Sequence, residues 1–402
     1  MDVSPPFPGG DRVIKPREVE FVSYPYEWAF GQLRAAALAT LEIQSRAVQY
    51  GMSLRDASAY NIQFVDGRPT LIDTASFEIY EPGRPWVAYR QFCEHFLGPL
   101  ALMAFRDPRL AGLLRTHIDG IPLDLAAALL PSNARIRPGL LLHVVAHARS
   151  QRRRSGRTDA VASSRRTFGE TALRGLVDSL KRTVSRLSWR PAASTWTTYY
   201  ADGESYSPAG VAGKRDTVAR FLDRVRPRMV WDLGANTGAF SRLAASKNVQ
   251  VVAFEGEPSC VEAMYRENVD RGETRLLPLV MDLANPSPSL GWAHDERMSL
   301  RSRGPADVVM ALALVHHLAI GNNVPLPRIA EFLADLGRFV ILEFVPREDP
   351  QVQRLLASRQ HDFPDYAPAP LEAALVRRFE VRERAGIPDS RRTLYLLERR
   401  LA

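Results

Sequence analysis

Short apolar runs and helical stretches alternate through the second half of the chain. The apolar runs occupy residues 229–233, 249–254, 276–280, 307–312 and 339–344. Apolar residues at helical spacing precede the first run, over residues 217–225, and occur between later runs, from Gly238 onward and through Met264. Strands that alternate with helices over this length predict a doubly wound, mostly parallel sheet with helices on both faces. A last pair of runs, 379–384 and 393–397, predicts an antiparallel edge hairpin.

The first half has a different pattern, which predicts a smaller, mainly helical α+β domain. Apolar residues recur at helical spacing from Phe30 to Val48, and Gly51 ends that helix. Two apolar runs then flank Asp66 and Gly67, which is typical of a tight β-hairpin. Residues 86–147, rich in leucine and alanine, predict further helices.

A polar segment, residues 151–166, separates the two patterns. After it, apolar residues repeat at helical spacing from Leu173 to Leu187 and predict a helix that leads toward the second domain. A chain of 402 residues is too long for one core. We therefore expect an accessory domain over 1–150, a basic linker and helix over 151–206, and the α/β domain over 207–402.

Basic residues are concentrated in one stretch. The chain has a net charge of +8, yet residues Arg149 to Arg190 hold 12 lysines and arginines against three acids, a net +9, which leaves −1 for the remainder. Two interpretations stay open. The stretch is a solvated connector, or it makes electrostatic contacts with RNA, DNA or a membrane surface.

Other features exclude several protein classes. Cys93 and Cys260 lie in separate halves, so neither a disulfide framework nor a cysteine-based zinc site is expected. No stretch approaches the roughly 18 uncharged apolar residues of a membrane span, and the first residues lack the pattern of a signal peptide. We expect a cytoplasmic protein without a membrane span; its oligomeric state stays open.

The densest motif is VWDLGANTGAF, Val230 to Phe240. An apolar strand runs into Asp232, and Gly234 and Gly238 bracket a turn that opens a helix, where exposed backbone amides favour an anionic group. The next strand ends in Glu255, placed to accept hydrogen bonds from two ribose hydroxyls. Asn236 stands where a dinucleotide-binding loop would have glycine, which counts against a nicotinamide dehydrogenase.

This series of strand ends, with Asp282 after the third strand, resembles the class I S-adenosylmethionine-dependent methyltransferases. The resemblance implies that S-adenosylmethionine is the cofactor and that no metal is needed. It implies that Asp232 and the turn Gly234–Asn236–Gly238 hold the methionine moiety. Glu255 would hold the ribose, and Asp282 with the backbone of Leu283 the adenine. The overall layout also resembles a nodulation-like group of bacterial methyltransferases, which implies no particular substrate.

Candidate catalytic residues follow the fourth and fifth strands. His316 and His317 could accept a proton from a hydroxyl or amine, because neutral imidazole suits that role near neutral pH. Adjacent residues of a helix do not face the same site, so at least one of the two is expected to be structural. Glu343 ends the fifth strand, where it either orients substrate or serves as a fixed structural carboxylate.

Residues 54–78 are weakly similar to the catalytic centre of kinase-like phosphotransferases, including those that modify aminoglycosides. Asp56 and Asn61 have the spacing of a catalytic base and a metal ligand, and Asp73 follows a hairpin as a second metal-binding acid does. However, the histidine expected two residues before Asp56 is Leu54, and no Gly-rich nucleotide loop precedes it. We expect a kinase-derived remnant or an unrelated hairpin, without phosphoryl transfer.

The function expected first is methyl transfer to an oxygen, nitrogen or carbon atom of a small molecule, a secondary metabolite or saccharide, with the N-terminal domain assisting substrate binding. Methylation of RNA or protein, guided by residues 149–190, is the second hypothesis. A third is a non-catalytic module that binds S-adenosylmethionine and recognises a partner.

Overall fold

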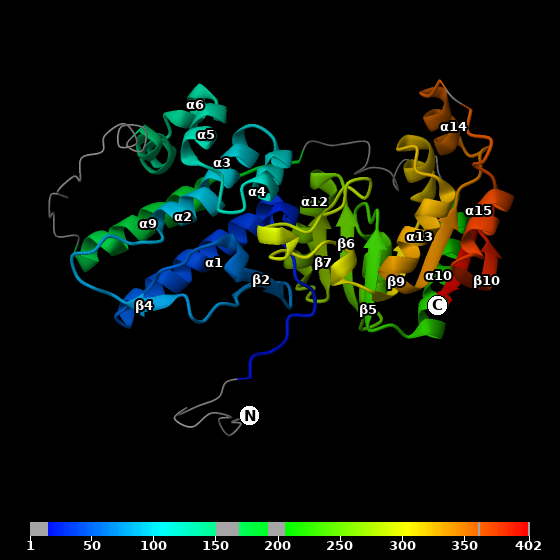
Figure 1. Cartoon of the computed structure of the whole chain (residues 1–402), viewed down its shortest axis with the longest axis horizontal. Coiled ribbons are helices and arrows are strands. Elements are labelled where there is room, and N and C mark those ends of the chain that lie inside the picture. Colours follow the sequence, from blue (N-terminus) through cyan, green and yellow to red (C-terminus); the bar gives the residue numbers. More distant parts are fainter. Residues whose placement is uncertain (1–14, 150–168, 192–205, 361, 401–402) are drawn as a thin grey trace.

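The computed structural model describes residues 15–149, 169–191, 206–360 and 362–400. It has a helical N-terminal region beside a region built on one large sheet (Figure 1). The expected boundary segment, residues 151–166, lies outside the described residues, so the limits of the three expected parts stay a prediction.

A seven-stranded sheet with helices on both faces forms the C-terminal region, in the order β10-β11-β9-β8-β5-β6-β7. Strands β5 to β9 are parallel to one another, and β11 pairs antiparallel with both β9 and β10. This arrangement is the doubly wound, mostly parallel sheet with an antiparallel edge that the sequence pattern predicts. The strands are β5 (Met229–Leu233), β6 (Gln250–Glu255), β7 (Leu276–Val280), β8 (Ala306–Ala311), β9 (Gly337–Phe344), β10 (Phe379–Gly386) and β11 (Thr393–Arg399). The helices are α10 (Pro208–Val225), α11 (Ala239–Ala245), α12 (Pro258–Arg271), α13 (Leu326–Leu336), α14 (Pro350–Ala357) and α15 (Pro368–Leu375), with short turns η6 (Trp292–His294), η7 (Arg301–Arg303) and η8 (His317–Gly321).

The sequence pattern placed the strands within a few residues of these bounds, but it missed the beginning of α10. That helix begins at Pro208, nine residues before the expected start at 217. Ser207 caps it by accepting a hydrogen bond from the Gly210 amide at 3.0 Å, and Pro208 occupies the first position, where its missing N–H costs nothing. The small residues that follow Pro208 hide the apolar stripe of this first half.

The N-terminal region is mainly helical, as predicted. Its long helices are α1 (Phe30–Gln49) and α9 (Glu170–Arg186), and the shorter ones are α2 (Tyr89–Phe92), α3 (Gly98–Phe105), α4 (Leu113–Thr116), α5 (Leu123–Leu129), α6 (Ser132–Arg135) and α7 (Pro138–Leu140). Short turns are η1 (Pro25–Glu27), η2 (Ala59–Asn61), η3 (Cys93–Leu97), η4 (Pro108–Gly112) and η5 (Leu141–Ala146), and the strands are β1 (Met52–Leu54), β2 (Ile62–Val65), β3 (Arg68–Leu71) and β4 (Phe77–Ile79). The predicted hairpin is β2–β3, and Asp66 and Gly67 both have positive φ, as its two-residue turn requires.

Two of the three kinase-like residues, Asn61 and Asp73, contact the same serine. Asn61 donates to Ser76 Oγ at 3.3 Å, and the same hydroxyl donates to Asp73. Asp56 instead accepts a hydrogen bond from the Ser58 amide. No group of three or more His, Cys, Asp or Glu side chains in the described part of the chain could hold a metal ion.

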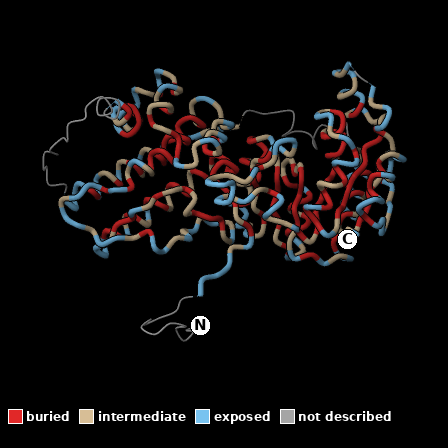
Figure 2. The backbone as a smooth tube through the Cα atoms, in the orientation of Figure 1, coloured by how far each residue is buried: buried red, intermediate tan, exposed pale blue. Residues whose placement is uncertain are grey.

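The two regions share one hydrophobic core. Phe21 packs its ring edge-on against Trp231 and Phe254 of the sheet, with centroid distances of 5.5 and 5.9 Å. Buried residues continue from α1 into the sheet region (Figure 2). The N-terminal region therefore packs directly against the sheet region.

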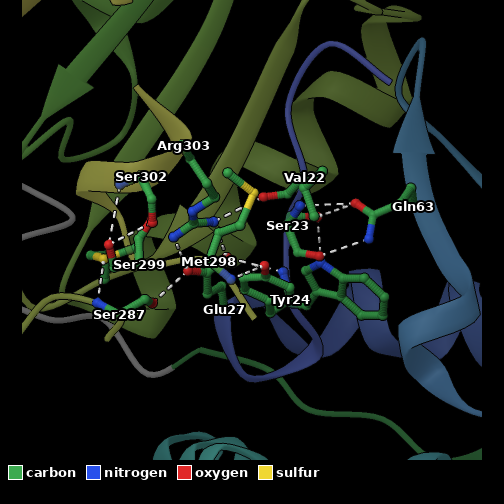
Figure 3. Close-up of polar contacts among 12 residues, drawn as sticks. Val22, Ser23, Tyr24, Glu27, Gln63, Ser287, Met298, Ser299, Ser302 and Arg303 are labelled. Carbon is green, nitrogen blue, oxygen red and sulfur yellow. Dashed lines mark hydrogen bonds and ion pairs between the residues drawn. The ribbon is translucent and has the colours of Figure 1, made fainter. Parts of the chain in front are cut away.

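A buried ion pair joins the regions at the same place (Figure 3). Arg303 donates to both carboxylate oxygens of Glu27, at 2.6 and 2.9 Å, and both side chains are at most 2% exposed. Glu27 also accepts hydrogen bonds from Ser287 Oγ at 2.5 Å and from the Tyr24 amide. Because Ser287 follows β7, this network holds the loop after that strand against η1.

The structure also describes the two cysteines and the lengths of the helices. Cys93 and Cys260 are buried and unpaired. No helix among the described residues is long and apolar enough to cross a membrane.

Candidate functional site

The loop after β5 is shaped by three residues with positive φ: Gly234, Asn236 and Gly238. The amides of Gly234 and Ala235 both donate to the Phe254 carbonyl of β6, at 2.9 and 3.1 Å. The loop is thereby fixed to the neighbouring strand at the carboxyl edge of the sheet, where doubly wound folds bind ligands.

The two glycines of this loop serve different purposes. A Cβ on Gly234 would meet only the tip of Leu314, and this residue borders the pocket described below. A Cβ on Gly238 would lie 2.7 Å from Met264 Sδ of α12. Gly238 therefore allows α12 to pack closely against the loop, and it does not line the pocket described below.

Glu255 lies at the end of β6 and faces the loop. Its two carboxylate oxygens accept hydrogen bonds from the amides of Asn236, at 2.8 Å, and Glu257, at 2.9 Å. Burial raises the pKa of Glu255, and these backbone donors oppose the rise. Each carboxylate oxygen has two lone pairs, so the group keeps capacity for a further donor such as a ribose hydroxyl.

Asp282 and Leu283 follow β7 and reach the same pocket. Asp282 is exposed and accepts a hydrogen bond from the Ala284 amide at 2.9 Å, which rigidifies the turn. Leu283 is half-buried and presents an apolar surface beside it. A carboxylate next to an apolar wall suits a flat heterocycle that carries an amino group.

These residues line one pocket of about 370 Å³. The expected residues in its wall are Gly234, Asn236, Glu255, Asp282, Leu283 and His317. The volume lies within the range of small-molecule sites. The pocket also includes residues that the sequence reasoning missed: Gly256, Glu257, Met281, Ala284, Leu312, Ala313, Leu314, Leu318 and Asn322. Most of these directly follow the ends of β6, β7 and β8, so their positions along the chain carried a signal.

Asp232 does not line this pocket. It is 2% exposed and accepts a hydrogen bond from Ser241 Oγ of α11 at 2.5 Å. Burial raises the pKa of Asp232 to about 6, and the Ser241 hydroxyl opposes that rise. Its hydrogen bond with Ser241 makes Asp232 a support for the beginning of α11, whereas the resemblance implied a contact with the methionine moiety.

The two histidines differ in exposure to the pocket. His317 lines it, at the beginning of the π-helical turn η8, and burial lowers its pKa, which keeps the imidazole neutral near pH 7. His316 is fully buried, and neither ring nitrogen has a hydrogen-bond partner among the described residues. The rings lie 4.1 Å apart, so His316 packs behind His317.

Glu343 belongs to a buried charge cluster. Lys214 Nζ of α10 lies 2.7 Å from its carboxylate, Tyr206 donates to it at 2.6 Å, and Arg392 is 3.5 Å away. Burial disfavours ionisation of Glu343, yet the charges of Lys214 and Arg392 hold its pKa below the ordinary value. With no exposed surface, Glu343 matches the fixed structural carboxylate of the two expected roles.

A second pocket, of about 270 Å³, adjoins the first at Gly256, Met281 and Asp282. Its opposite wall comes from the N-terminal region and includes Tyr26, Trp28, Met103, Arg109 and Arg115. Sequence reasoning could not find these residues, because only the fold brings η1, η4 and α4 to the edge of the sheet.

No family model matches the chain. The nodulation protein NoeA of Rhizobium meliloti (strain 1021) is 36% identical over 391 residues, which are 96% of this chain and 82% of NoeA. The N-methyltransferase NodS from Bradyrhizobium japonicum WM9 is 10% identical, with 48% of this chain and 98% of NodS covered and a TM-score of 0.36. The bifunctional kinase-methyltransferase WbdD is 19% identical, with 54% and 45% covered and a TM-score of 0.35. Superpositions at such TM-scores do not establish a shared activity.

Proposed function

This chain belongs to the family of the nodulation protein NoeA, and from that premise we propose that it transfers a methyl group from S-adenosylmethionine to an oxygen, nitrogen or carbon atom of a small molecule, a secondary metabolite or saccharide. One observation carries the proposal. Glu255, Asn236, Asp282 and Leu283, which come from three strand ends, border a single pocket next to the glycine turn.

The pocket residues would divide the cofactor between them. Glu255 would bind the ribose hydroxyls, Asp282 and Leu283 the adenine, and Gly234 with Asn236 the methionine end. When bound, S-adenosylmethionine supplies an electrophilic methyl group, so the protein chiefly has to align the acceptor and exclude water. His317 is the proposed acceptor of a proton, because it lines the pocket and is neutral near pH 7.

Binding of S-adenosylhomocysteine to the full chain, measured by calorimetry, tests the cofactor assignment. Glu255→Ala should weaken binding by about 5- to 150-fold, which corresponds to roughly 1–3 kcal/mol for lost charge-assisted hydrogen bonds. Asp270→Ala removes an exposed acid of α12 away from the pocket and is the matched control. Equal affinity of the two variants would contradict the assignment.

The N-terminal region would assist substrate binding through the second pocket. Arg115 gives one wall a positive charge, whereas Arg109 is already paired with Asp107; the charge of Arg115 favours an acceptor that carries an anionic group. Arg115→Ala should raise KM for such an acceptor and leave the affinity for S-adenosylhomocysteine unchanged. An unaltered KM would exclude this pocket from substrate binding.

Incubation of the protein with methyl-labelled cofactor and fractionated cell extract separates the functions. Label in small molecules supports the proposal, and label in RNA or protein supports the second hypothesis. Cofactor binding without label in any fraction would favour the non-catalytic binding module. We place the protein in the cytoplasm as part of the same proposal.

A further inference from the structure

A third pocket, of about 330 Å³, lies in the N-terminal region, between the C-terminal part of α9 and the segment that contains α7 and η5. Arg137, Arg182 and Arg186 line it, together with Ser179, Thr183 and Leu142. No acidic side chain is among the described residues in its wall. It shares no lining residue with the two pockets at the sheet edge.

Close helix packing forms the floor of this pocket. A Cβ on Gly139 would lie 2.2 Å from Thr183 Oγ1, so glycine is what lets α7 lie directly against α9. Thr183 and Ser179 have partners of their own, the Ser179 carbonyl and His143 Nε2. The floor is therefore rigid, and the arginines rise from its two sides.

The cations of α9 fall into two groups. Arg174 pairs with Glu170, and Lys181 pairs with Glu42 of α1. Arg182 and Arg186, four residues apart on one face, are exposed and form no ion pair with any described residue. Asp178 is the nearest acid on that helix, and it does not line the pocket.

Arg137 completes the group from the opposite side. Its guanidinium lies 4.5 Å from the centre of the Phe105 ring, a cation–π contact that fixes its position. Three arginines, two on α9 and one across the cleft, thus line a space that no acidic side chain of the described residues borders. Planar guanidinium groups in such an arrangement suit a phosphate.

Apolar side chains are exposed beside these arginines. Leu142 in the wall is 57% exposed, and Ile136 and Leu141, next to Arg137 and Leu142 in the chain, are 74% and 41% exposed. Aliphatic side chains gain nothing from contact with water or with a sugar-phosphate backbone, and RNA is usually bound with aromatic rings. Cations flanked by exposed leucine and isoleucine instead suit the headgroup boundary of a lipid bilayer.

We propose that this surface, defined by Ile136, Arg137, Leu142, Arg182 and Arg186, docks on membranes that contain anionic phospholipids. The headgroup phosphate occupies the pocket between the three arginines, and the aliphatic side chains enter the boundary of the acyl chains. The attachment is peripheral and reversible.

Sedimentation of the full chain with lipid vesicles tests this proposal. Vesicles of phosphatidylcholine mixed with phosphatidylglycerol should bind the protein, and vesicles of phosphatidylcholine alone should not. Arg182→Ala/Arg186→Ala should weaken binding roughly 30-fold, since each basic residue near an anionic surface contributes about 5-fold. Leu142→Ser should weaken it several-fold.

Arg220→Ala/Arg224→Ala is the matched control, because it removes two exposed arginines with the same spacing from α10. Its binding should equal that of the wild type, and thermal melting checks that every variant is folded. Equal binding by the α9 variant, or equal binding to uncharged vesicles, overturns the proposal. Arginine-dependent binding of inorganic phosphate that Leu142→Ser leaves intact, without vesicle binding, points to a soluble phosphorylated ligand and also overturns it. The proposal is also overturned if RNA displaces the protein from the vesicles and Leu142→Ser leaves vesicle binding unchanged.

Discussion

Arg303→Met tests how much of the stability depends on the buried contact between the two regions. The substitution keeps most of the side-chain volume and removes the guanidinium that donates to Glu27 and to the Val22 carbonyl. Glu27 would keep its hydrogen bonds from Ser287 and Tyr24 but would lose its only countercharge among its described contacts. Breaking a buried pair from one side costs about 3–5 kcal/mol, a large part of the roughly 5–15 kcal/mol that stabilises a typical domain.

Urea denaturation of the full chain, followed by circular dichroism, measures the loss. The double variant Glu27→Leu/Arg303→Met should recover most of it, because a well-packed apolar pair replaces the ion pair at little net cost. Arg303→Met should also weaken S-adenosylhomocysteine binding, since Ser287 lies on the loop that carries Asp282 and Leu283. A loss below about 1 kcal/mol, or a double variant no more stable than the single one, would refute this account.

Three further predictions concern other parts of the chain. Burial raises the pKa of Asp232 from 3.8 to about 6, so the stabilisation from its protonated form is complete below pH 4 and lost as the pH rises through 6. Asp232→Asn should remove about 3 kcal/mol from the difference in unfolding free energy between pH 4 and pH 7. The same pH dependence in the wild type and in the variant would contradict this. No transfer of labelled phosphate from ATP with magnesium should occur, because no Gly-rich nucleotide loop precedes Asp56; transfer that Asp73→Ala abolishes would show the opposite. Binding to bulk RNA should be weak between about 50 and 200 mM salt, and replacement of Arg152, Arg153, Arg154, Arg165 and Arg166 by serine should not change methyl incorporation; tight binding lost together with incorporation into RNA would favour RNA as substrate.

The sheet was predictable from sequence because each parallel strand is buried on both faces and reads as a continuous apolar run. The β2–β3 hairpin was predictable because Asp66 and Gly67 tolerate the positive φ of its turn. The contact between Glu27 and Arg303 had no such signal, since 276 residues separate them and each is an ordinary charged residue in its own segment. The second pocket was hidden for the same reason, because its walls come from distant parts of the chain.

The roles of the carboxylates at the strand ends could not be predicted from the sequence pattern. Asp232, Glu255 and Glu343 each lie at or near the carboxyl end of a parallel strand, and their positions along the chain do not tell which of them borders a pocket. Only Glu255 borders the pocket, whereas Asp232 bonds to Ser241 and Glu343 to Tyr206 and Lys214. The role of Glu343 could not be predicted without the first turns of α10, which the apolar pattern did not reveal. Those turns contain Lys214, the countercharge of Glu343. Without that helix the countercharge of Glu343 could not be assigned, and a carboxylate without a known countercharge at a sheet edge is indistinguishable from a catalytic one.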